Sequence, residues 1–197
     1  LLGDAEFNEV FFTDVRIPDS QRLGAEGDGW KVSLTTLMFE RLAVGGRPAQ
    51  SPDLRAVVGL AKSLGYEDLE NSPLAESLAR FYIADEGMAL TRMRSTTAVS
   101  RGQAPGPEAS IGKLVMAKTL QDMSAYALEL LEEAGISDRE DGPARMYKLW
   151  YLWSAGLRIA GGTDEVLRNI IAERVLGLPP EDRPDRNTPF NQLGRAG

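Results

Sequence analysis

The sequence contains no cysteine and no histidine among its 197 residues. This absence excludes thiolate nucleophiles, Cys/His zinc sites and Ser-His-Asp triads within the chain. Any chemistry must therefore use carboxylates, hydroxyl groups, backbone groups or a cofactor, and we assign no metal site.

Positive charge is also scarce, since 22 Lys and Arg face 29 Asp and Glu, for a net charge of -7 and a pI near 4.8. Nucleic-acid binding needs clustered cations, so we expect no nucleic-acid partner. No apolar run approaches the roughly 20 residues of a membrane span, and the first residues lack the basic and apolar regions of a signal peptide. We expect a soluble, cytoplasmic protein whose partner is a small molecule or another protein.

Residues 6–18 form a segment of β-favouring character, with Phe7, Val10, Phe12 and Val15 set among polar residues. The pattern predicts a strand. A single strand cannot pair its own edges, so we expect its partner strands to lie outside this sequence.

After a glycine-rich turn at residues 24–29, the apolar spacing becomes helical. It predicts a short helix from Thr163 to Gly177, with Thr163 as the N-cap and with Asp164 and Glu165 complementing the helix dipole. Such helices, joined by Pro and Gly turns, indicate an all-α four-helix bundle. The longer helices are expected at 30–44, 52–64, from 74 to 101, from 108 to 135, and from 143 onward.

Three segments in order resemble acyl-CoA dehydrogenases. They are EFNEVFFTDVRIP with Gly29-Trp30, the motif at residues 39–43 (FERLA), and GGTDEVLRNIIAERVLGLP at 161–179. The resemblance covers nearly the whole chain and implies the C-terminal four-helix-bundle domain of that family at 28–180. It also implies that residues 1–27 end the middle β domain and that 181–197 form a polar tail. Since the other domains are missing, we expect the 197 residues alone to be inactive.

The resemblance implies FAD-dependent α,β-dehydrogenation of an acyl-CoA thioester, as in fatty acid and related lipid degradation. In the family, a carboxylate removes the α-proton while the β-hydrogen leaves as hydride to the flavin. The electrons pass to an electron-transferring flavoprotein. The expected assembly is a homo- or hetero-oligomer, either a dimer or a tetramer.

The catalytic base is assigned through the motif at residues 39–43. Many members place the carboxylate just before the last Gly-Thr, but this chain has Gly161 there and no carboxylate. A subset carries the base in a Glu-Arg pair on the first long helix, which Glu40 and Arg41 match. Periodicity alone favours a solvated surface glutamate at position 40, and the motif match favours the base.

The other candidate site residues each have an ordinary structural interpretation as well. Arg41 matches a position near CoA, or forms a surface ion pair. Gly161 is expected to polarise the thioester carbonyl through its backbone N–H, and Gly162 to contact the substrate, unless both are plain turn glycines. Thr163 and Glu165 match positions beside the flavin, while they also suit helix capping, and both roles are compatible.

Two stretches depart from the family pattern. Glu129, Glu132 and Glu133 occupy the region of a Gln and a Gly-Gly pair that approach the flavin, and residues 65–68 replace a phosphate-binding arginine segment. Carboxylates there would repel a pyrophosphate. The pattern favours a mixed assembly in which this chain supplies the base and another chain completes the flavin site.

Two competing interpretations remain open. The chain is alternatively a catalytically silent partner subunit, or a helical binding module whose similarity to the family is accidental. The aromatic residues Trp150, Tyr151 and Trp153 are assigned to the core or an interface. Acyl-chain specificity is expected to depend partly on Leu37, Met38 and the helix break at residues 45–46.

Overall fold

The structure, a computed structural model, describes residues 8–44, 46–103, 106–137, 142–182, 188 and 190–193, without the side chains of residues 38, 41–44 and 190. Within these ranges every regular element is helical, which confirms the predicted helical fold class. None of the described helices is long and apolar enough to cross a membrane. The elements are η1 (Asp19–Gln21), α1 (Gly29–Val44), α2 (Leu54–Ser63), α3 (Ala75–Ser100), α4 (Ala109–Leu130), α5 (Glu133–Ile136), α6 (Ala144–Leu157), α7 (Asp164–Ile170), η2 (Ile171–Val175) and η3 (Phe190–Gln192).

The predicted strand is not formed in the part of it that the structure describes. Residues 8–18 are irregular, and Phe11 and Phe12 are 82% and 80% exposed. Residues 6 and 7 of the expected strand lie outside the described ranges. The physical reason is that β-hydrogen bonds need a second strand, and the described residues provide none.

The helix boundaries follow the predicted Pro and Gly breaks closely, with two differences. The segment expected as one helix from 108 to 135 divides into α4 and α5. The segment expected as one helix from 163 to 177 divides into α7 and the π-helical η2. A π-helical turn is wider than an α-helical turn and is often found at functional sites.

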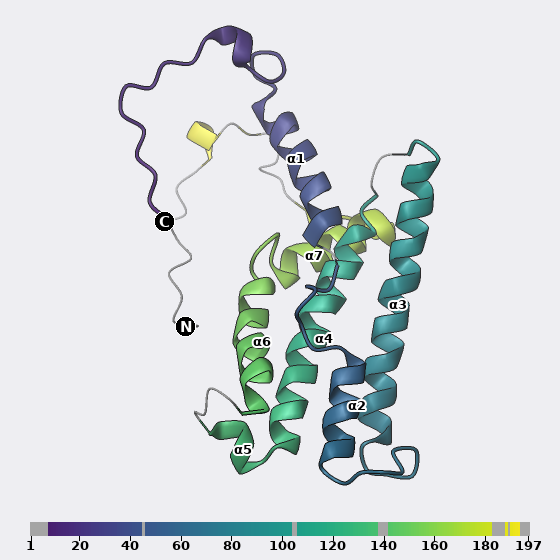
Figure 1. Ribbon diagram of the computed structural model, residues 1–197. Helices are drawn as coiled ribbons and strands as arrows, with labels where there is room; N and C mark the ends of the chain where they lie inside the picture. The colour runs from purple at the N-terminus through teal and green to yellow at the C-terminus, as the bar shows by residue number, and fades with distance from the viewer. Residues whose placement is uncertain are drawn as a thin grey trace.

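Helix α4 lies in the middle of the bundle, between α3 and α6 (Figure 1), and it also contacts α1, α2, α5 and α7. Its buried residues recur at intervals of three and four, so they form a stripe that faces the neighbouring helices. Met116, Leu120 and Met123 are the large apolar members of this stripe, and all three are almost fully buried. The complete set is Ser110, Lys113, Met116, Ala117, Thr119, Leu120, Met123, Ser124 and Ala127.

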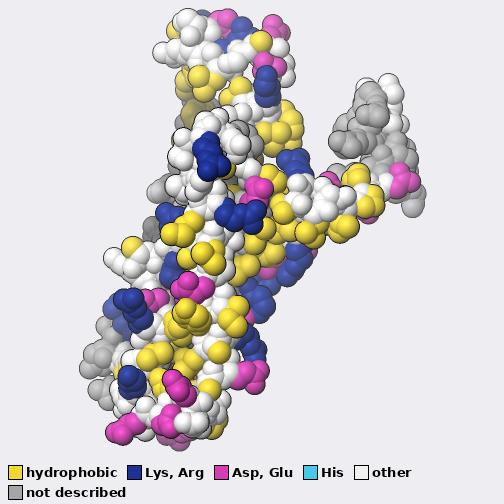
Figure 2. Space-filling view, turned by 90° about the vertical axis from the view of Figure 1, so that its right-hand side faces the viewer, with side chains coloured by type: hydrophobic (Ala, Val, Ile, Leu, Met, Phe, Trp, Pro, Cys, Tyr) yellow, Lys and Arg dark blue, Asp and Glu magenta, His cyan; other side chains and the backbone are white. Residues whose placement is uncertain are grey.

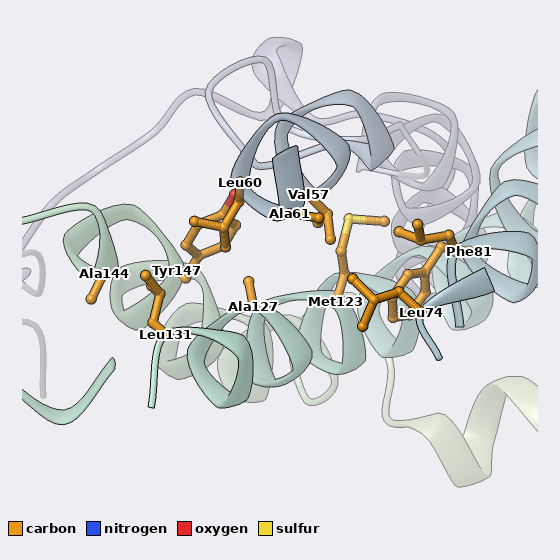
Figure 3. Packing of buried hydrophobic residues seen from close by; sticks show 11 residues of the cluster. Val57, Leu60, Ala61, Leu74, Phe81, Met123, Ala127, Leu131, Ala144 and Tyr147 are labelled. Carbon is orange, nitrogen blue, oxygen red and sulfur yellow. The ribbon is translucent and has the colours of Figure 1, made fainter. Parts of the chain in front are cut away.

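The main hydrophobic cluster joins α2, α3, α4 and α6 at the end of the bundle away from α7. Figure 3 shows the Met123 side chain reaching from α4 towards α2 and Phe81, and Tyr147 beside Leu60. Phe81 also packs edge-on against Tyr126, with ring centroids 5.7 Å apart. Full burial of each large apolar side chain stabilises the fold by about 1.5–3 kcal/mol.

Helix α1 contributes little to this core. Figure 1 shows it extending away from the bundle, with its C-terminal end over the first part of α4. Trp30 is 76% exposed and Phe39 is 58% exposed, and Leu34 and Leu37 are also exposed. The described apolar side chains of α1 are therefore largely uncovered, although the helix contacts α4.

Helix α3 also exposes apolar side chains on its outer side. Figure 2, which looks at the molecule from the side of α3, shows hydrophobic side chains scattered between charged ones. Tyr82, Ile83, Leu90 and Met93 of α3 are more than half exposed. Only one stripe of α3 is therefore used in the core, through Leu78 and Phe81.

The corner between α4 and α5 generates a stability prediction. A Cβ at Gly135 would lie 2.2 Å from the Leu128 carbonyl oxygen, so the backbone must shift. We expect Gly135→Ala to lower the free energy of unfolding by about 2 kcal/mol or more. The matched control is Gly156→Ala in α6, where a Cβ meets nothing within 4 Å.

We expect the control to raise the free energy of unfolding by about 0.5–1 kcal/mol, because alanine restricts the unfolded chain. Urea unfolding of both variants measures the difference. Equal effects of the two substitutions would contradict the packing described for this corner.

Candidate functional site

The site begins with the turn that joins α6 to α7. Gly161 and Gly162 both have positive φ, 65° and 100°, which side chains with a Cβ rarely adopt. Thr163 then begins the helix, since its hydroxyl oxygen accepts a hydrogen bond from the Val166 N–H at 3.3 Å. The predicted N-cap is confirmed, and the two glycines are required by the turn.

The first turn of α7 carries the two predicted acidic residues in different environments. Glu165 is exposed, and its own backbone N–H and the Thr163 hydroxyl hydrogen-bond to its carboxylate and lower its pKa. Asp164 is only 3% exposed. The capping role of Thr163 is therefore observed, while contact of Thr163 and Glu165 with a flavin stays a prediction.

The turn leaves several backbone donors available. Within the described part of the chain, the N–H groups of Gly161, Gly162, Thr163 and Asp164 meet no acceptor at hydrogen-bonding geometry, and the resemblance to the family singles out Gly161 among them. Gly161 and Gly162 are each partly exposed, so a ligand reaches this turn from solvent. An unpaired amide at such a turn suits an anionic or polarised oxygen.

Glu40 lies on α1, four residues before the end of the helix, and its side chain is exposed. The side chain of Arg41 lies outside the described residues, so its contact with CoA stays a prediction. Both α1 and α7 pack against α4, and Figure 1 places the C-terminal end of α1 at the same end of α4 as α7. The elements that carry Glu40 and Gly161 are therefore neighbours through α4, and direct convergence of the two groups stays a prediction.

A group of charged and polar side chains, two of them buried and two partly exposed, lies behind the turn, and sequence analysis did not find it. The Lys113 ammonium donates a hydrogen bond to the Gly162 carbonyl at 2.6 Å. The Arg158 guanidinium pairs with Asp164 at 2.6 Å and donates to the Gln121 side chain at 2.8 Å. The available signal was Lys113 itself, a cation spaced three and seven residues before the apolar Met116 and Leu120. We call Lys113, Gln121, Arg158 and Asp164 the turn-support cluster.

Burial dominates the electrostatics of Lys113. The side chain is 1% exposed, and burial lowers its pKa because the charged form loses hydration. Asp164 acts in the opposite direction and Arg158 in the same direction, each through its charge. Within the described residues, the Oδ1 atom of Asp164 and the Oγ atom of Ser110 are buried without a hydrogen-bond partner.

The segment between α1 and α2, residues 46–53, is fixed by two long-range contacts. The Arg47 guanidinium pairs with Asp85 of α3, and the Trp150 indole N–H donates to the Gln50 carbonyl at 3.1 Å. Trp150 is buried. Trp150 therefore belongs to the core, whereas Tyr151 and Trp153 are exposed, and their assignment to an interface stays a prediction.

A cavity of about 400 Å³ lies where this segment meets α3 and the start of α4. Small or apolar residues such as Met88, Ala89 and Gly112 line part of it. Charged residues line another part, so the wall combines apolar surface with charge of both signs; they are Arg47, Asp53, Asp85, Glu86, Arg92 and Glu108. The cavity adjoins the helix break that follows Glu40 by six residues.

Comparison with known proteins identifies the family. Residues 27–176 match the model of the acyl-CoA dehydrogenase C-terminal domain. The chain is 36% identical over 184 residues to acyl-CoA dehydrogenase IpdE1 of Mycolicibacterium smegmatis, an alignment that covers 92% of this chain and 45% of that protein. It is 33% identical over 179 residues to acyl-CoA dehydrogenase FadE34 of Mycobacterium tuberculosis, covering 91% of this chain and 24% of that protein. The chain thus spans less than half the length of these curated relatives.

A solved structure agrees with the sequence matches. The Tcur3481-Tcur3483 steroid ACAD superposes with a TM-score of 0.67 at 26% sequence identity, over 86% of this chain and 45% of that chain. The helical architecture of α1 to α7 is therefore that of the family's C-terminal domain. The chain belongs to the acyl-CoA dehydrogenase family.

Proposed function

We propose that this chain is the C-terminal part of an FAD-dependent acyl-CoA dehydrogenase and carries its catalytic base, Glu40. The observation that carries the proposal is the glycine turn before α7. Its Gly161 N–H is free of acceptors within the described residues, and it lies next to the helix that also packs against α1. Family membership makes an acyl-CoA thioester the expected ligand of such an amide.

In this proposal the chain supplies two groups to the reaction. The Glu40 carboxylate removes the α-proton, and the Gly161 N–H donates to the thioester oxygen, where negative charge develops as the proton leaves. Gly162 borders the same oxygen, and Arg41 binds phosphates of CoA. When bound, FAD supplies the oxidant that takes the β-hydrogen as hydride.

The residues of this chain suit the N–H and O–H groups of a flavin cofactor better than its pyrophosphate. The exposed Glu165 carboxylate and the Thr163 hydroxyl suit N–H and O–H groups of the cofactor. The carboxylates of Glu129, Glu132 and Glu133 are also exposed, and they disfavour a pyrophosphate. We therefore propose a mixed oligomer in which a second chain type binds the phosphates and the electrons pass to an electron-transferring flavoprotein.

The acyl group is proposed to be bulky. The solved relative is named a steroid ACAD, and the cavity beside the helix break offers about 400 Å³ near the end of α1. Its mixed lining suits a bulky group with polar substituents better than a straight alkyl chain. Leu37, Met38 and the helix break at residues 45–46 are proposed to contribute to acyl-chain specificity.

The base assignment predicts the effect of Glu40→Gln in the full-length enzyme. Loss of the carboxylate removes the proton acceptor, so kcat is expected to fall by about 100-fold to 10,000-fold. The melting temperature should stay unchanged, because the side chain is exposed. Glu76→Gln on α3, which removes an exposed glutamate paired with Arg80, is the matched control and should retain full activity.

Turnover of an acyl-CoA series, followed with an artificial electron acceptor, measures both variants. Activity retained by Glu40→Gln would refute the assignment. If turnover survives but the chain is still needed for assembly, the alternative of a catalytically silent partner subunit is supported. The exposure of Glu40 is the observation that keeps this alternative open.

The mixed-assembly proposal predicts incomplete flavin binding by the full-length protein purified alone. Flavin absorbance per chain is expected to be well below one, and to rise when the partner chain is co-expressed. The phosphate-repelling carboxylates are the physical reason. Full flavin occupancy in a pure homo-oligomer would contradict the proposal.

A further inference from the structure

The turn-support cluster places a buried cation on the core-facing stripe of α4. Lys113 is 1% exposed and lies on the same stripe of α4 as Met116 and Ala117. A buried ammonium costs stability unless hydrogen bonds and opposite charge compensate it. An aliphatic residue at this position would hold the helices together without that cost, so the cation is expected to have a use besides packing.

The only hydrogen bond of the ammonium within the described residues goes to the Gly162 carbonyl, 49 positions along the chain. Gly161 and Gly162 have the widest conformational freedom of any residue type. The two glycines alone therefore do not fix the backbone conformation of the turn. The 2.6 Å hydrogen bond from the Lys113 ammonium restricts the backbone at the Gly162 carbonyl.

An ion pair joins the two ends of the same turn. Arg158 directly follows the last residue of α6 as its C-cap, Asp164 is the first residue of α7, and their 2.6 Å ion pair closes the turn between them. Arg158 is bound in addition to Gln121 of α4. Lys113 and Gln121 are eight residues apart, about two helical turns, so they lie on one face of α4. Helix α4 therefore contacts the middle of the turn through Lys113, and it contacts the start of the turn through Gln121 and Arg158.

We propose that Lys113 is a positioning residue of the acyl-CoA site. Its buried ammonium holds the Gly161-Gly162-Thr163 turn in the conformation that presents the Gly161 N–H to the thioester carbonyl. Gln121, acting through Arg158, supports the same conformation. The inference rests on the proposed function, because it assumes that the Gly161 amide polarises the substrate.

The test uses the full-length holoenzyme with its partner chain, and three variants. Lys113→Met removes the charge and keeps the length of the side chain. Gln121→Leu removes one partner of Arg158 without touching the buried ammonium, and it serves if Lys113→Met does not fold. Lys118→Met is the matched control, since Lys118 is an exposed lysine of the same helix, paired with Asp122.

The first measurement is the split between kcat and KM, taken well below each melting temperature. Loss of one well-placed amide donor costs about 100-fold to 1,000-fold in kcat, and loosening it should cost less. We expect about a tenfold to hundredfold loss of kcat in Lys113→Met, a smaller loss in Gln121→Leu, and unchanged KM. Lys118→Met should match the unmodified enzyme. Unchanged kcat in a folded Lys113→Met, or in Gln121→Leu if the first does not fold, would overturn the proposal.

The second measurement does not depend on turnover. A chromophoric α,β-unsaturated acyl-CoA absorbs at longer wavelength when hydrogen-bond donors polarise its carbonyl, so the shift on binding reports the amide contact. We expect Glu40→Gln to keep this shift and Lys113→Met or Gln121→Leu to reduce it. No shift in the unmodified enzyme would defeat the proposed role of Gly161, whereas a normal shift that Lys113→Met leaves unchanged would defeat only the role of Lys113.

Discussion

The hydrogen bond between the Lys113 ammonium and the Gly162 carbonyl joins the centre of the bundle to the turn that forms the candidate site. In the proposed function, the direction of the Gly161 N–H depends on where that turn lies relative to α4. The far end of α4 is fixed by apolar packing around Met123 and Ala127. The near end is fixed by charge, through Lys113 and the pair between Arg158 and Asp164. Helix α4 thus packs in the hydrophobic core at one end and fixes the two-glycine turn at the other.

The two parts of the candidate site are supported in different ways. The Gly161 turn is held from behind by the turn-support cluster, so its geometry is built into this chain. Glu40 lies on α1, whose apolar residues Trp30 and Phe39 are exposed. The position of α1 therefore depends on whatever covers its exposed face in the complete assembly, while the position of the turn does not. Contacts within this chain therefore fix the Gly161 amide, whereas the position of the Glu40 carboxylate depends on what covers α1.

Sequence patterns predicted the helices well and the strand badly, for a common physical reason. Helical hydrogen bonds are local, so periodicity and caps such as Thr163 determine a helix from nearby residues. A strand at residues 8–18 needs partners that the described residues lack. The glycines and Thr163 were recognised through their motif, and the cap was confirmed. Lys113 was missed because a lysine is normally exposed, and its burial depends on a partner 49 residues away.

The central claim is that Glu40 and the Gly161 N–H act on one thioester. A crystal structure of the full-length enzyme with bound acyl-CoA tests it most directly. We expect a Glu40 carboxylate oxygen at about 3 Å from the α-carbon of the ligand, and the Gly161 nitrogen at about 3 Å from the thioester oxygen. A ligand whose carbonyl lies away from Gly161, or a Glu40 carboxylate turned to bulk solvent in that complex, would contradict it.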